Sequence, residues 1–360
     1  LMNDNIGGLL FGGNVIGNPR LFFNGSGPAG LPAMPTTETT NVLSGSFSNM
    51  GVPGAKSFHF VAPGYGNLAG VPVGLANPYF ARMASSANAT IIGDAVAQNP
   101  TFFTLSEVGG NDVLSYATSG GVGVDQTGNF DPATYGGNDI TDPNVFAQVF
   151  SGQVAALTGN GAKGALANVP YITNLPHFTT VSYNPVPLDA ATAGALNQGY
   201  AVYNGGLQQA FAALAGTGLF TAEELAQRTI SFSAGAGNAM VIIDEDLTDL
   251  GAINPAFAAI PQYRQATAED LFVLPLSSLI PQGFGTQIPL EDKWVLIPSE
   301  QNAIRTATDA YNATIAAVAD ANGLAIVDFK AILEEASTTG ISDGDFTLTT
   351  SLVTGGLVSL

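Results

Sequence analysis

The chain has 360 residues, of which 46% are hydrophobic and only 10% are charged, so it can bury a large core and is not disordered as a whole. Nine basic against 28 acidic residues give a formal net charge of −19, which repels phosphate backbones and argues against nucleic-acid binding. The absence of cysteine excludes disulfides, thiolate metal sites and a cysteine nucleophile.

The N-terminal third of the chain predicts loops followed by the first regular elements. Residues 1–56 are rich in glycine, asparagine, proline and threonine without a period, which is typical of extended loops. A short apolar stretch follows at 57–61. Asn77 and Pro78 predict a helix start, with asparagine as the cap and proline at the first position. Residues 101–105 predict a buried strand.

From there on, helices and strands alternate. Asp142 and Asp189 are predicted to cap two longer helices, and Gly323 to end a third that begins near Ser299. The predicted strands lie at 165–169, 229–233, 239–243 and 324–327. Alternation of this kind indicates crossover units and a mostly parallel sheet. We therefore predict an α/β fold, a three-layer α/β/α sandwich in a single domain over 1–360, with an inserted cap at 244–296.

Both ends of the chain are expected to be truncations. The sequence opens on Leu1 followed by Met2, and it stops at Leu360 inside an apolar run. No apolar run reaches the length of a membrane span.

Three short motifs match known patterns but not the structural context that those patterns need. Residues 25–30 fit GxGxxG, yet three prolines nearby preclude the helix that a dinucleotide site requires. Residues 340–344 fit GxSxG, but the helix precedes it and the strand follows, so a turn is predicted. Residues 93–96, Gly-Asp-Ala-Val, resemble a Gly-Asp-Ser-Leu block with alanine in place of the serine, and they are expected to belong to a helix end.

Two further segments carry the functional hypothesis. Asn49 to Gly54 leads into the first apolar stretch, and Gly109 to Asp112 (Gly-Gly-Asn-Asp) follows the strand at 101–105. Ligands bind at the C-terminal ends of parallel strands, and a backbone N–H together with an asparagine amide can stabilise an oxyanion. A strand-to-loop turn is the alternative reading. A second Gly-Gly-Asn-Asp at 136–139 has no strand before it and is predicted to be a turn.

In this pairing the chain resembles the SGNH (GDSL-type) ester hydrolases, in particular their long bacterial surface-lipoprotein branch. That family has a GDS block, an N-x-x-x-x-G block, a G-x-N-D block and a D-x-x-H block. Residues 49–54 and 109–112 match the second and third in order. The resemblance implies that the Gly54 N–H and the Asn111 side-chain amide bind the oxyanion.

The chain departs from the family at the triad. It has no GDS block before Asn49 and no D-x-x-H, since Lys56 and Asn174 precede its two histidines, His59 and His177, by three residues. Packing or surface roles are predicted for both histidines. Residues 355–360 resemble the run ahead of the family's last block, so serine and histidine are expected outside this segment. The sheet would then lack an interior strand, which predicts marginal stability or another segment in that place.

Metal and acyl-chain sites have weaker support. The acidic turns 244–246 and 343–345 could bind calcium, but solvated turns are the favoured interpretation. The apolar segment 270–296 could line an acyl pocket, although ordinary core is favoured.

We therefore predict the catalytic roles for Gly54 and Asn111, with no cofactor and no metal. The expected function is hydrolysis of a lipid or small-molecule ester by the parent protein, located in the periplasm, on the cell surface or outside the cell. The alternative is a non-catalytic surface protein that binds carbohydrate or polymer on the same fold.

Overall fold

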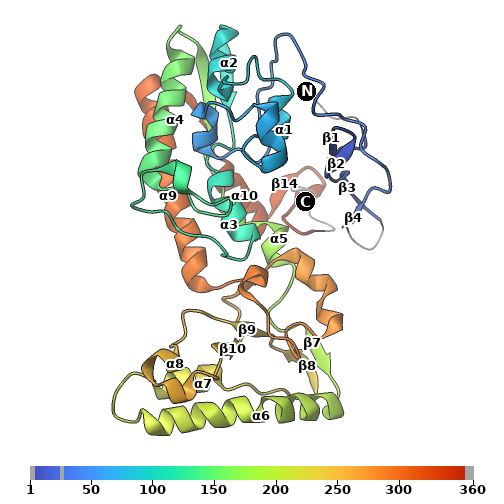
Figure 1. Ribbon diagram of the computed structural model, residues 1–360, viewed down its shortest axis with the longest axis vertical. Helices are drawn as coiled ribbons and strands as arrows, with labels where there is room; N and C mark the ends of the chain where they lie inside the picture. The colour runs from blue at the N-terminus through green and yellow to red at the C-terminus, as the bar shows by residue number, and fades with distance from the viewer. Residues whose placement is uncertain (1–4, 25–27, 353–360) are drawn as a thin grey trace.

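The computed structural model describes residues 5–24 and 28–352 and has a mixed α/β fold in two parts. The upper part in Figure 1 contains the parallel sheet, and residues 186–265 form a lobe below it. The predicted cap, 244–296, begins in this lobe and returns to the upper part, whereas the longest helix of the lobe lies outside that range. Among the described residues, no helix combines the length and apolarity needed to cross a bilayer.

The parallel sheet has three strands in the order β13-β6-β5. They are β5 Phe102–Leu105, β6 Lys163–Ala167 and β13 Ala325–Val327. The predicted strands at 101–105, 165–169 and 324–327 therefore form, and they pair in parallel as expected. The other strands of the described chain form six two-stranded antiparallel sheets, so the parallel sheet is smaller than predicted.

Helices of the upper part pack around this sheet and share its core. α4 contacts α9 and α2, and their apolar faces meet at Phe146, Phe150 and Tyr311. The predicted caps explain where these helices lie, because Asp142 accepts hydrogen bonds from the first turn of α4 and Gly323 ends α9 in the left-handed conformation. The helices are α1 Pro78–Ala81, α2 Ile91–Ala97, α3 Asn111–Thr118, α4 Pro143–Thr158, α5 Pro176–Thr179, α9 Pro298–Asn322 and α10 Phe329–Thr338.

The N-terminal segment is more regular than the predicted loops. It contains the antiparallel pairs β1 Leu9–Phe11 with β2 Asn14–Gly17 and β3 Leu21–Phe23 with β4 Pro28–Gly30. Gly12 and Gly13 join the first pair at φ of 57° and 81°, which a two-residue hairpin loop requires. The Glu38 carboxylate accepts both of their N–H groups, at 3.0 and 2.9 Å.

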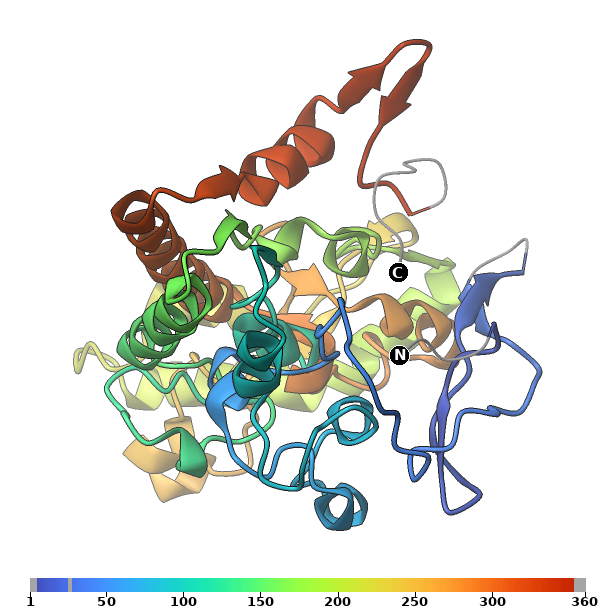
Figure 2. The same ribbon diagram turned by 90° about the horizontal axis from the view of Figure 1, so that it is seen from above.

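The remaining elements of the upper part are short. β11 Leu271–Phe272 pairs with β12 Val295–Leu296, and β14 Ile341–Asp343 pairs with β15 Phe346–Leu348. Figure 2 shows α10 and the β14–β15 hairpin along one side of the molecule. Residues 57–61, the first apolar stretch, form a 3-10 helix, η1, which has no strand edge to pair. β5 has β6 as its partner on one side and lies at the end of the described sheet, with the Phe102 side chain 61% exposed.

The lobe differs from the prediction at 229–233, which form no strand. The elements of the lobe are α6 Ala190–Ala213, α7 Ala222–Arg228, α8 Leu250–Ile253, β7 Val186–Leu188, β8 Gly235–Asn238, β9 Val241–Ile243 and β10 Tyr263–Gln265. Asn204 on α6 exchanges two hydrogen bonds with the backbone of Ile230, and Asn197 exchanges two with Phe232. Side-chain amides of a helix therefore take the place of a neighbouring strand.

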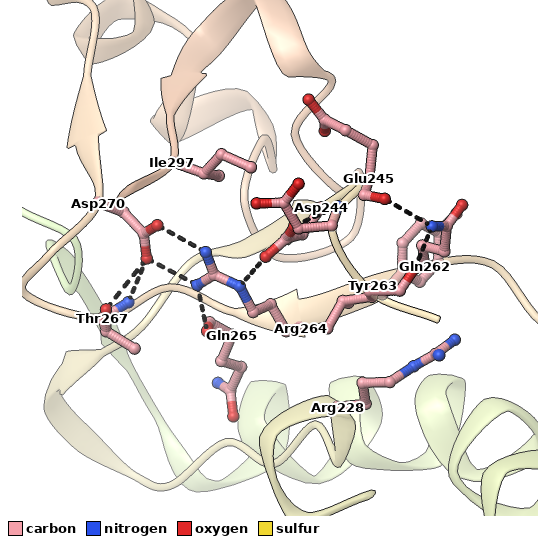
Figure 3. A network of polar contacts seen from close by, with 12 residues as sticks. Arg228, Asp244, Glu245, Gln262, Tyr263, Arg264, Gln265, Thr267, Asp270 and Ile297 are labelled. Atoms are coloured by element: carbon pink, nitrogen blue, oxygen red, sulfur yellow. Dashed lines mark hydrogen bonds and ion pairs between the residues drawn. The ribbon is translucent and has the colours of Figure 1, made fainter. Parts of the chain in front are cut away.

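A buried ion-pair network joins β9, β10 and the segment that leaves the lobe (Figure 3). The Arg264 guanidinium binds both oxygens of Asp270, at 2.7 and 2.6 Å, and its Nε binds Asp244. All three side chains are buried. A buried charge is stable only when it is paired and hydrogen-bonded, so this network fixes the exit of the lobe.

Candidate functional site

The Gly-Gly-Asn-Asp segment at 109–112 connects β5 to α3. Gly109 has φ of 103°, and a Cβ there would come within 2.9 Å of Val169 and 3.0 Å of Phe146. Only glycine fits this conformation and this close approach. Gly110 is the N-cap, so that Asn111 and Asp112 open the helix at the C-terminal side of the strand.

The segment at 49–54 forms a turn held by its own first residue. Asn49 Oδ1 accepts the Gly51 N–H at 2.8 Å. Gly54 has φ of 75° and is exposed, and a Cβ there would meet nothing within 4 Å. Within the part of the chain that the structure describes, the Gly54 N–H donates to no protein group. It is therefore available to a ligand.

The structure brings these two segments together. The Asn111 side-chain amide donates to the Ala55 carbonyl, with 3.0 Å between nitrogen and oxygen. A primary amide has two N–H groups, so this bond orients the side chain and leaves one donor for another acceptor. Asn111 is half-buried beside the residue that follows Gly54. The two residues proposed from the sequence are thus neighbours, although they are 57 positions apart.

Four buried residues to which the sequence assigned no role surround this contact. Asp112 accepts hydrogen bonds from Ser57, and Gln153 on α4 donates to the Ser57 carbonyl at 2.9 Å. Lys56 is buried and its ammonium donates to the Asp139 carbonyl. Burial lowers the pKa of Lys56. A polar residue next to a glycine-rich block carries no sequence pattern of its own, so none of these was predicted.

The second Gly-Gly-Asn-Asp, at 136–139, is the predicted turn. The Asp139 N–H donates to the Gly136 carbonyl at 3.2 Å, and the Asp139 carboxylate accepts the Gly136 N–H at 2.7 Å. The same carboxylate accepts the Val124 N–H and the Gln126 amide, at 3.0 and 2.6 Å. These bonds close a loop and leave Asn138 exposed.

Both histidines are packed side chains. His59 stacks on Tyr65 with 4.3 Å between ring centres, and its Nδ1 accepts the Lys56 N–H. Burial, with the Lys56 charge adding to it, lowers the pKa of His59 to about 4. Burial also lowers the pKa of His177, whose Nε2 is enclosed without a hydrogen-bond partner. Both imidazoles are therefore neutral at neutral pH.

The three other motifs have structural roles where they are described. Residues 340–344 belong to the β14–β15 hairpin, as the predicted turn requires. Residues 93–96 lie in α2, where Asp94 accepts two hydrogen bonds from Ser85. In the GxGxxG pattern, residues 25–27 lie outside the described chain, and Pro28 begins a strand rather than a helix. Residues 355–360, which resemble the run ahead of the family's last block, also lie outside it.

Carboxylates gather beside one of the two predicted calcium turns, 244–246, which contributes Glu245. Asp244 is engaged by Arg264, whereas Glu245 lies beside Asp292 and Glu300, with ligand oxygens within 4.8 Å of one another. These three line a cavity of about 430 Å³. Burial raises the pKa of Glu300 to about 9 and that of Asp292 to about 6. The three come from separate segments, so only the folded chain reveals the cluster.

The apolar segment at 270–296 mainly contributes to the core. Phe272, Leu276 and Leu290 are fully buried in one cluster at the top of the lobe. A cavity of about 650 Å³ lies instead beside residues 49–54, where Phe47 and Met50 are among its lining residues. For these three residues the structure therefore agrees with ordinary core, the interpretation favoured for 270–296, rather than with the lining of an acyl pocket.

Comparison of the chain with protein-family models, with curated proteins and with solved structures finds no match. The functional argument therefore depends on the contact between residues 54–57 and 111–112.

Proposed function

We propose that this chain provides the oxyanion-binding part of an SGNH-type ester hydrolase with a three-layer α/β/α fold. The observation that carries the proposal is the hydrogen bond from the Asn111 amide to the Ala55 carbonyl. This bond joins Asn111 to the residue that follows Gly54, whose N–H is exposed and unbonded. Two donors of this kind on rigid backbone are what acyl transfer needs.

In the proposed reaction, a serine hydroxyl attacks the acyl carbon of an ester while a histidine accepts its proton. The carbonyl oxygen becomes an oxyanion, which the Gly54 N–H and the Asn111 amide stabilise. The alcohol leaves with the proton from histidine, and water then releases the acid from the acyl-serine. The serine and the histidine are proposed to come from outside this segment, and the parent protein to lie in the periplasm, on the cell surface or outside the cell.

The test uses the complete protein encoded by the gene that contains this chain. We expect it to hydrolyse p-nitrophenyl acetate or butyrate, and Asn111→Ala to lower kcat by roughly 10²–10³, the usual effect of losing one oxyanion donor. The matched control is Asn138→Ala in the second Gly-Gly-Asn-Asp, which should leave kcat unchanged. Equal effects of the two substitutions would reject the proposed role of Asn111.

Absence of any ester hydrolysis by the complete protein would reject the enzyme altogether. The alternative, a non-catalytic protein that binds carbohydrate or polymer through its glycine- and asparagine-rich loops, would then be tested by glycan-array binding.

A further inference from the structure

Ser57, three residues after Gly54, is held at every one of its polar groups. Its N–H donates to Asp112 Oδ2 at 2.9 Å and its hydroxyl donates to Asp112 Oδ1 at 2.7 Å. Its carbonyl accepts the Gln153 amide at 2.9 Å. Ser57, Asp112 and Gln153 are all completely buried. The start of η1 is therefore fixed by side chains from α3 and α4.

A fully buried carboxylate is a costly way to hold a turn. Burial raises the pKa of Asp112, and the hydrogen bonds from Ser57 and the charge of Lys56 act against that rise. Other turns of the molecule are held instead by partly solvated side chains, such as those of Asn49 and Asn67, which accept backbone N–H groups. All polar groups of Ser57 are hydrogen-bonded inside the protein, and such a buried set of bonds specifies one geometry, whereas a solvated turn allows several.

The network acts on the proposed oxyanion site from both sides. Asp112 follows Asn111 at the start of α3, so the same helical turn holds Ala55 through Asn111 and Ser57 through Asp112. Gly54 is joined directly to this doubly held segment. Movement of Ser57 would therefore change the distance between the Gly54 N–H and the Asn111 amide.

We infer that Asp112 is a positioning residue, which sets the separation of the two oxyanion donors by binding the backbone and the hydroxyl of Ser57. This inference rests on the proposed function. Asp112 is buried and does not contact the substrate. The acyl oxyanion of a neutral ester is the group whose stabilisation depends on it.

The test compares Asp112→Asn, Ser57→Ala and their double variant in the complete protein, with Asp139→Asn as the matched control. We expect kcat for p-nitrophenyl butyrate to fall about 100-fold for Asp112→Asn, as displaced catalytic groups commonly cause, and about tenfold for Ser57→Ala. KM should stay within about twofold, because ground-state binding is not altered. The double variant should be no slower than Asp112→Asn, since both act through one link.

Hydrogen exchange provides a readout that needs no activity. In Asp112→Asn, amides 55–57, which are hydrogen-bonded in the wild type, should exchange about tenfold faster, the order expected when a local hydrogen-bonded unit opens, while α4 stays protected. Unchanged kcat in Asp112→Asn, or exchange that rises equally in α4, would overturn the inference. If the wild-type protein hydrolyses no ester, the proposed function fails. The exchange result then decides alone whether Asp112 positions this segment.

Discussion

The two Gly-Gly-Asn-Asp segments have the same four residues but different surroundings. The first follows the strand β5 and opens α3, and its aspartate is completely enclosed while its asparagine contacts another chain segment. The second lies in a loop, where its aspartate closes a turn and its asparagine is exposed. The comparison shows that the preceding element, rather than the motif, decides whether these residues form a site.

The largest difference between the copies is expected at the aspartates. Asp112→Ala leaves the N–H and hydroxyl of Ser57 buried without an acceptor and removes a negative charge that acts on the buried Lys56, so it should cost about 3–5 kcal/mol of unfolding free energy. Asp139 is buried as well, but its hydrogen-bond donors belong to loop residues that are exposed or half-buried, Val124, Gln126 and Gly136. Because water can reach these donors when the carboxylate is removed, Asp139→Ala should cost about 1–2 kcal/mol. Urea unfolding measures both values. Similar losses for the two variants would show that the buried network around Asp112 is not special.

Lys56 connects the two copies indirectly, since its chain neighbours Ala55 and Ser57 are bonded to the first copy and its ammonium binds the Asp139 carbonyl of the second. Lys56→Met keeps the apolar stem but removes this charged donor, and it should cost about 2–3 kcal/mol. Lys163→Met, at an exposed position, should change the unfolding free energy by less than about 0.5 kcal/mol. If Lys56→Met left the unfolding free energy unchanged, the two copies would be independent.

Gly109 of the first copy and Gly137 of the second should differ next. Gly109→Ala introduces a Cβ at positive φ against Val169 and Phe146, which should cost about 2 kcal/mol through strain and overpacking. Gly137→Ala has open space at that atom and no positive φ. It should be neutral within about 0.5 kcal/mol. Thermal unfolding of the two variants compares them directly.

The smallest expected difference is in pH dependence, which has opposite signs at the two aspartates. Burial raises the pKa of Asp112, so the folded protein holds this proton more tightly and the group's contribution to stability falls as pH rises above 3.8. At Asp139 burial acts in the same direction, but hydrogen bonds from Gln126, Gly136 and Val124 prevail and lower its pKa. Its contribution is present above 3.8 and is lost as pH falls through the lowered pKa.

Urea midpoints at pH 3 and pH 7 test this pair of signs. The cost of Asp139→Asn should grow toward pH 7 and stay below about 1 kcal/mol, because the loop residues that donate to this carboxylate are exposed or half-buried. The cost of Asp112→Asn should instead be larger at pH 3. The same trend in both variants would contradict the assignment of opposite shifts.

Much of the secondary structure could be predicted because local chemistry decides it. Asp142 and Asp189 cap helices where the sequence places them, and the apolar run at 101–105 forms a strand. The strand predicted at 229–233 was wrong, because the groups that pair with this segment are asparagine side chains on α6. Periodicity describes a segment's own residues and contains no information about such a partner.

The candidate site was predictable in part and for a different reason. Gly54 and Asn111 were singled out by resemblance to a family, and the structure joins Asn111 to Ala55, the residue after Gly54. Ser57 and Gln153 could not be found, because their importance comes from tertiary hydrogen bonds. The carboxylates around Glu300 likewise meet only after the lobe folds back on α9.

The asparagine-lined segment at 229–233 also has a consequence for solubility. Its N–H groups at Ser231 and Ser233 bind the side chains of Gln265 and Asn238, while Asn197 and Asn204 occupy the opposite edge. An extended segment with exposed pairing groups recruits strands from other molecules, which leads to aggregation. Here side-chain amides already occupy both edges. These bonds therefore disfavour fibril-like association of the lobe through this segment.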